Sequence, residues 1–136
     1  MPKPETPLLT TDCIAVDDAG RIVLIRRKNP PFQGAYALPG GFVDVGETVE
    51  QACRRELEEE TGLIARDLRL VGVYSSPDRD PRFHTASVVF LTHIGTQMPQ
   101  AGDDAAEAEL VENWDSIEFA FDHGQIMRDA RRLLKG

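Results

Sequence analysis

The chain has 136 residues, 41% of them hydrophobic, a size that suits one compact domain with a single core. Its 23 acidic and 15 basic residues give a formal net charge of −8, which opposes binding to a nucleic acid backbone. No basic segment precedes an apolar run near the N-terminus, and no stretch is long enough to span a bilayer. We therefore expect one domain, residues 1–136, in a cytoplasmic protein without a nucleic acid or membrane partner.

The residue pattern predicts a mixed α/β domain with several strands and two main helices. Apolar, β-branched runs indicate strands, Gly, Pro and Asp indicate turns, and apolar residues at helical spacing indicate helices. In chain order we expect a tail (1–7), a hairpin of two strands (8–16 and 21–26) around a turn (17–20), a loop (29–34), a short extended segment (35–38), a break at 39–41, a helix (49–61), strands at 68–76 and 85–93 around a charged loop (77–84), an acidic loop (102–109) and an amphipathic helix (122–134).

The helix after the glycines has recognisable ends. Thr48 followed by Gln51 fits a capping box, and Gly62 suits a C-terminal cap. At about 100° per residue, four apolar residues form one stripe that should face the core. They are Val49, Ala52, Cys53 and Leu57. Because the two cysteines of the chain have no metal-ligand spacing, Cys53 is expected to be a buried core thiol.

The inward stripe turns acidic at Glu56, Glu59 and Glu60, whereas Glu58 points the other way. A solvated helix face is the ordinary role of an acidic run, and it fits Glu58. The other three carboxylates would repel one another and lose solvation unless a positive group lay among them. Oxygen ligands of this kind favour Mg²⁺ or Mn²⁺ over zinc.

The glycines before the helix suit the same metal site. Without a side chain, Gly40 and Gly41 let the backbone approach closely, so a carbonyl of either one is a candidate further ligand.

Nine residues between 41 and 63 match every fixed position of the Nudix box, GX5EX7REUXEEXGU, in which U is a bulky aliphatic residue. They are Gly41, Glu47, Arg55, Glu56, Leu57, Glu59, Glu60, Gly62 and Leu63. The chain therefore resembles the Nudix hydrolases, and the order of its strands and closing helix is similar as well. The resemblance implies a Nudix-type α/β/α sandwich with a mixed β-sheet, and hydrolysis of a nucleoside diphosphate linked to another group.

The resemblance also implies roles for residues of the box. Glu56, Glu59 and Glu60 are expected to bind the metal, and Glu56 or Glu60 to help deprotonate the attacking water. Glu47 and Arg55 are expected to form an orienting pair beneath them. A divalent cation suits this chemistry, because it neutralises the charge with which a diphosphate repels nucleophiles.

Many Nudix enzymes recruit a further acid from a distant loop, and the acidic loop offers four candidates. They are Asp103, Asp104, Glu107 and Glu109. We expect Asp104 to be the additional metal ligand, with a solvated loop as the alternative.

The substrate is indicated by residues 75–90. Arg79, Arg82 and His84 provide donors for phosphate and ribose hydroxyls, although such a loop is often only solvated surface. Arg27, at the end of a strand, is a further candidate for phosphate. This stretch and two others resemble the ADP-ribose pyrophosphatase subgroup of the family. The two others are residues 26–43 and 119–127.

A few residues allow other interpretations. Phe83 replaces a glycine that is common in this subgroup, which changes the shape of the pocket. Trp114, Phe119 and Phe121 could stack a base, but core packing is the expected role. His123 is expected to be structural or exposed.

Three functions follow from these observations. The leading one is Mg²⁺- or Mn²⁺-dependent hydrolysis of ADP-ribose to AMP and ribose 5-phosphate. The second is pyrophosphohydrolysis of nucleoside triphosphates, including oxidised ones, and the third is a non-catalytic nucleotide-sugar sensor. Similar ADP-ribose enzymes are often homodimers, so a homodimer is expected as well.

Overall fold

The computed structural model describes residues 2–100 and 107–134. The elements in chain order are β1 (Leu8–Asp17), β2 (Ile22–Arg26), β3 (Tyr36–Ala37), β4 (Gly40–Phe42), α1 (Val49–Thr61), β5 (Arg69–Tyr74), β6 (Thr85–Gly95), β7 (Glu107–Val111), the short 3-10 helix η1 (Trp114–Ser116) and α2 (His123–Leu134). None of the described helices is long and apolar enough to cross a membrane.

The strands form one mixed sheet around the parallel pair β1 and β6. The strand order is β3-β2-β1-β6-β5, with β4 paired to β1 and β7 paired to β2. All the other pairs are antiparallel, including the predicted hairpin of β1 and β2. β1 and β6 are rich in Val, Ile and Thr, which pack well on a pleated surface, and they make the longest pairing in the sheet.

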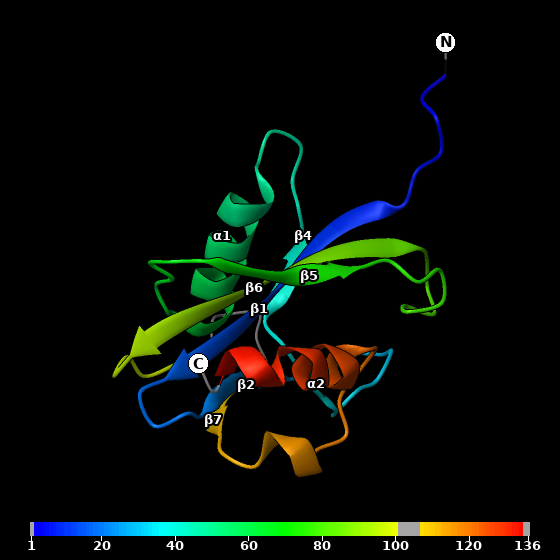
Figure 1. The fold of residues 1–136 in the computed structure, drawn as a ribbon. Coiled ribbons are helices and arrows are strands. Elements are labelled where there is room, and N and C mark those ends of the chain that lie inside the picture. The colour runs from blue at the N-terminus through cyan, green and yellow to red at the C-terminus, as the bar shows by residue number, and fades with distance from the viewer. Residues whose placement is uncertain (1, 101–106, 135–136) are drawn as a thin grey trace.

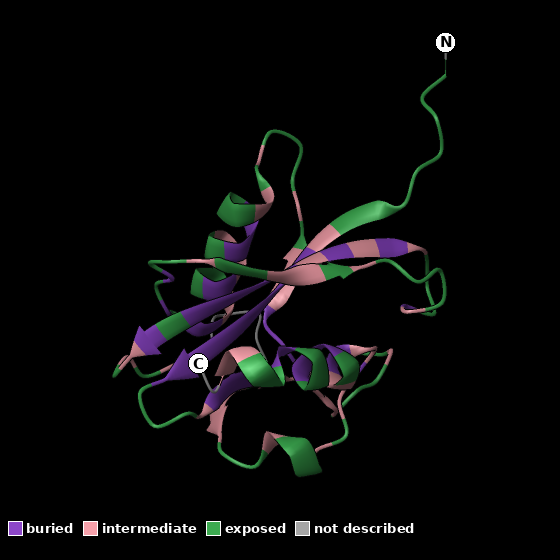
Figure 2. Ribbon diagram, viewed as in Figure 1, coloured by how far each residue is buried: buried purple, intermediate pink, exposed green. Residues whose placement is uncertain are grey.

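The two helices lie on opposite faces of the sheet (Figure 1). Because side chains alternate along a strand, β1 contributes to both cores: Cys13 packs with Leu57 of α1, and Ile14 packs with Ile126 of α2. The central strands are accordingly buried on both faces (Figure 2). This confirms the predicted α/β/α sandwich with a mixed sheet.

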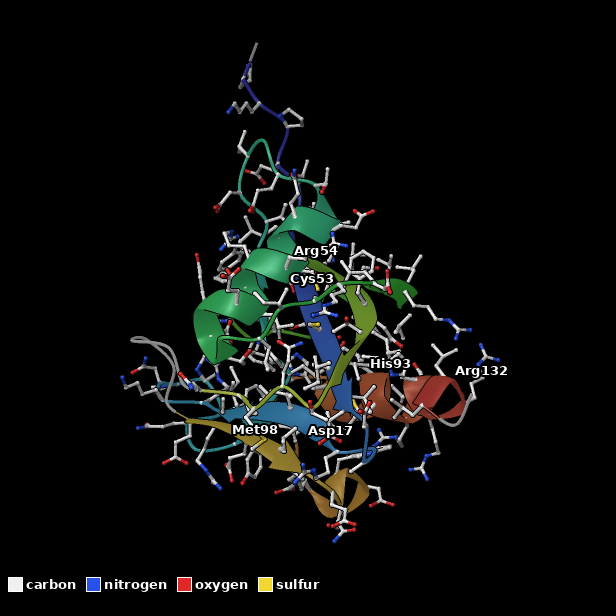
Figure 3. The ribbon with its side chains drawn as sticks, turned by 90° about the vertical axis from the view of Figure 1, so that its left-hand side faces the viewer. Asp17, Cys53, Arg54, His93, Met98 and Arg132 are labelled. Atoms are coloured by element: carbon white, nitrogen blue, oxygen red, sulfur yellow. The ribbon has the colours of Figure 1, made fainter. Side chains whose placement is uncertain are left out.

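α1 has the predicted ends. The Thr48 hydroxyl accepts the Gln51 N–H at 3.0 Å, and the Gln51 side chain accepts the Thr48 N–H at 2.8 Å. Gly62 ends the helix with a φ of 74°, which glycine adopts without strain, and donates its N–H to the Glu58 carbonyl. Cys53 lies where α1 meets the sheet (Figure 3) and is buried as expected.

Two predictions about local structure are corrected. Residues 40–42 form β4 instead of a break, because Gly40, Gly41 and Phe42 pair with β1. The end of the expected acidic loop, residues 107–109, belongs to β7, which pairs with β2. The remainder of that loop, with Asp104, lies outside the described residues. Both strands form because they pair with a segment far away in the sequence. A local residue pattern gives no information about such pairing.

Candidate active site

β4 and the acidic end of α1 are packed closely together. The Gly40 N–H donates to Oε1 of Glu60 at 3.3 Å. A Cβ placed on Gly41 would lie only 2.7 Å from the carboxyl carbon of Glu56. A side chain at position 41 would therefore displace the Glu56 carboxylate, which glycine leaves in place.

Arg55 lies among the carboxylates of the box. Its Nε and Nη2 donate to the two oxygens of Glu47 at 2.7 and 2.9 Å. Its Nη1 donates to Glu56 at 2.8 Å and to Glu59 at 3.3 Å. The hydrogen bonds from Arg55, and next that from the Asp44 N–H, lower the pKa of Glu47 to about 2. Glu47 thus stays ionised and holds the guanidinium in place.

Glu60 is in the opposite situation. Burial, followed by the hydrogen bond with Glu56 and its negative charge, raises the pKa of Glu60 to about 9. Its Oε2 atom is buried and has no hydrogen-bond partner in the structure. A buried carboxylate oxygen without a donor is costly, and a cation would satisfy it.

These carboxylates fit a divalent cation with oxygen ligands. Glu56 and Glu60 are partly buried side by side, whereas the Glu59 side chain is 60% exposed and so less desolvated than expected. Within residues 2–100 and 107–134, no three His, Cys, Asp or Glu side chains are already gathered as a formed metal centre. In this arrangement Arg55 supplies the positive charge among the acids.

A cleft opens beside β4 on the side of the sheet that α2 covers. Its lining includes Asp12, Gly41, Arg27, Arg79, Arg82 and Phe121. Three of the four residues predicted to bind substrate therefore meet at one cavity that also contacts the box. The fourth, His84, does not line it, and its Nε2 lies 2.9 Å from the Ser75 carbonyl oxygen.

Two of the arginines already have carboxylate partners. Nε and Nη2 of Arg79 donate to Asp122 at 2.9 and 2.7 Å, and Nη1 donates to the Thr85 hydroxyl at 2.8 Å. Arg79 is only 6% exposed, so it mainly ties the loop before β6 to the start of α2. Arg82 pairs with Asp80 at 2.9 Å but is 43% exposed, and its guanidinium can face a ligand.

Arg27 is the arginine best placed for an anion. In the described part of the chain it has no ion pair with a carboxylate, and its Nε donates to the Pro31 carbonyl at 2.7 Å. Its guanidinium lies 4.8 Å from the centre of the Phe121 ring. Burial, and next the positive charge of Arg82, lower the pKa of Arg27, so a negative ligand would relieve an unfavourable arrangement.

The cleft also contains residues to which the sequence assigned no binding role. Phe121 is one of them: core packing was expected for it, but it lines the cleft. Core packing was also expected for Trp114 and Phe119, and these two do pack against the core. His123 is buried as a structural residue, yet it lines the cleft as well. Asp12 was not singled out. A carboxylate inside the apolar run of β1 was the available signal for it.

Comparison with known proteins agrees with this geometry. The chain is 51% identical over 130 residues to the ADP-ribose pyrophosphatase of Methanocaldococcus jannaschii, covering 96% of this chain and 76% of that protein. Its fold is similar, with a TM-score of 0.87 and 28% identity, to the NUDIX domain of Shewanella oneidensis NrtR complexed with ADP ribose, covering 96% of this chain and 90% of that one.

A further solved structure contains a metal. It is a bifunctional NMN adenylyltransferase/ADP ribose pyrophosphatase from Francisella tularensis, complexed with AMP and a Mn ion. The TM-score is 0.80 at 28% identity, and the match covers 95% of this chain but only 42% of that one. The family model of the NUDIX domain matches residues 6–134. Together with the box and the fold around it, this match shows that the chain belongs to the Nudix hydrolase family.

Proposed function

We propose that the protein hydrolyses the pyrophosphate bond of ADP-ribose to give AMP and ribose 5-phosphate. The observation that carries the proposal is the junction of two features at β4: the carboxylates of α1, and a cleft with Arg27 and Arg82 in its walls. The 51% identity to an archaeal ADP-ribose pyrophosphatase supports ADP-ribose as the substrate.

The cation is Mg²⁺ or Mn²⁺, held by Glu56, Glu59 and Glu60 with a carbonyl of Gly40 or Gly41. The partnerless oxygen of Glu60 supports this set, because hard cations prefer carboxylate and carbonyl oxygens. The bound cation supplies neutralisation of the diphosphate charge and activation of water. Asp104 stays a prediction, since it lies outside the described residues.

Residues of the chain carry out proton transfer, orientation and substrate binding. Glu56 or Glu60 accepts a proton from the attacking water. The oxygen of that water bonds to phosphorus while the bond from phosphorus to the bridging oxygen breaks. Glu47 holds Arg55, which orients Glu56. Among the candidates for substrate binding, Arg27 and Arg82 contact the phosphates. Arg79 positions the cleft wall, and His84 stays a predicted ligand of the substrate.

The proposal is tested by measuring hydrolysis of ADP-ribose, other nucleoside diphosphate sugars, dinucleotides and nucleoside triphosphates with Mg²⁺ or Mn²⁺. Glu60→Gln removes a proposed ligand, and Glu58→Gln is the matched control, because Glu58 is exposed on the other side of the same helix turn. We expect a preference for ADP-ribose that Glu60→Gln abolishes and Glu58→Gln preserves. Preference for triphosphates would support the second function, and binding of ADP-ribose without turnover the third.

Two finer expectations also stay predictions. The homodimer is checked by light scattering during size-exclusion chromatography, and the cytoplasmic location by fractionation of cells.

A further inference from the structure

Asp12 is a buried carboxylate on the floor of the cleft. It lies opposite Gly40 in the pairing of β1 with β4 and is 8% exposed. One oxygen, Oδ2, accepts a hydrogen bond from the Ser87 hydroxyl at 2.5 Å and lies 3.8 Å from Nη2 of Arg79. This oxygen is therefore held by β6 and by the loop before it.

The other oxygen, Oδ1, is held only weakly by the protein. Nε2 of His123 lies 3.5 Å from it, which is too long for a strong hydrogen bond. Nδ1 of His123 accepts the Leu38 N–H at 3.0 Å, so the proton of the neutral ring is on Nε2. Burial lowers the pKa of His123, which keeps the ring neutral.

The surroundings leave Asp12 with an uncompensated charge. Arg79 is the cation within reach among the described residues, and it is already paired in bidentate fashion with Asp122. Two carboxylates thus share one guanidinium at the edge of a cleft whose outer wall attracts anions. A phosphate at Oδ1 would be repelled, whereas a donor without negative charge suits this atom.

The position of Asp12 indicates which group of the substrate donates to Oδ1. Asp12 is next to Gly40, and Gly40 contacts Glu60, where the proposed function places the diphosphate. The group attached directly to either phosphate is the C5 oxygen of a ribose, whereas the base is one sugar further away. A carboxylate is a suitable acceptor for ribose hydroxyls, as in dinucleotide-binding domains.

We propose that Oδ1 of Asp12 accepts a hydrogen bond from a ribose hydroxyl of the substrate, which makes Asp12 a specificity-determining residue of the cleft. The proposal rests on the proposed function, since it takes the diphosphate to lie at Glu60. Ser87 and Arg79 hold the Asp12 side chain so that Oδ1 faces the sugar.

The test compares kcat/KM for ADP-ribose with kcat/KM for analogues that each lack one hydroxyl of either ribose. In the wild-type protein we expect one analogue to lose roughly tenfold to a hundredfold, the range for a hydrogen bond to a charged group. In Asp12→Ala, which removes the acceptor, ADP-ribose should lose a similar factor, and that analogue should then be used about as well as ADP-ribose. Asp67→Ala, at an exposed position, is the matched control and should keep the wild-type preference.

Two results would overturn the proposal. One is a wild-type enzyme that uses all the analogues as well as ADP-ribose, a result that does not depend on the folding of any variant. The other is an Asp12→Ala protein that retains the full preference for the hydroxyl, which would leave Asp12 with a structural role alone. If the wild type hydrolyses triphosphates but not ADP-ribose, the proposed function fails, and the same comparison is made between ribonucleotides and their 2′- and 3′-deoxy forms.

Discussion

Replacing Glu60 by Gln should stabilise the metal-free protein increasingly as the pH rises. Burial raises the pKa of Glu60 from its ordinary value of 4.5 to about 9. Between these values the folded protein holds a proton that the unfolded chain releases. The contribution of Glu60 to stability is therefore complete below about pH 4.5 and is lost as the pH rises toward 9. Gln, which never ionises, has no such dependence.

The size of the effect follows from the pKa of the unfolded chain. Each pH unit above 4.5 costs the wild-type protein about 1.4 kcal/mol until the folded carboxyl itself ionises. The gain from Glu60→Gln should thus be under about 1 kcal/mol at pH 5, roughly 3 kcal/mol at pH 7 and no more than about 5 kcal/mol at pH 8. A different hydrogen bond to the Gly40 N–H would shift all of these values together and leave the slope unchanged.

The assay is urea unfolding in the presence of a chelator at pH 5, 6, 7 and 8, with the free energy of unfolding compared between variant and wild type at each pH. Glu58→Gln is the control, because it makes the same substitution at an exposed position of the same helix. A constant difference for Glu60→Gln over this range would contradict the prediction, since it would mean that Glu60 is ionised in the folded protein. Addition of Mg²⁺ should stabilise the wild type and the control but not Glu60→Gln.

Three further outcomes are expected. Gly41→Ala should weaken Mn²⁺ binding in isothermal titration by at least about tenfold, because its Cβ would lie 2.7 Å from the Glu56 carboxyl carbon. Gly72→Ala, whose Cβ would meet nothing nearer than 3.6 Å, should bind normally. Arg55→Lys should lower kcat/KM roughly tenfold to a hundredfold, since lysine cannot form the bidentate pair; unchanged kinetics would argue against an orienting role. Leu57→Ala should lower the free energy of unfolding by about 2–5 kcal/mol, and a loss below about 1 kcal/mol would contradict its burial in the core.

α1 and the acidic half of the site follow from local features of the sequence. The capping box of Thr48, the glycine cap at residue 62 and the apolar stripe ending at Leu57 are local features, and all act within one helix. The spacing of Glu56 and Glu60 on that helix follows from 3.6 residues per turn. The pattern also predicted a mixed α/β domain, because strand and helix periods differ clearly along the chain, whereas the sandwich was implied by the resemblance to the Nudix hydrolases.

The groups that face these carboxylates depend instead on contacts between segments far apart in the chain. Gly40 and Asp12 are neighbours because β4 pairs with β1, and the cleft forms because the loop after β5 and the start of α2 meet above that pair. Arg27 and Phe121 are far apart in sequence, and their contact depends on how α2 packs on the sheet. Which ionisable groups are buried, paired or left without a partner is set by such long-range contacts. A local sequence pattern carries no information about them.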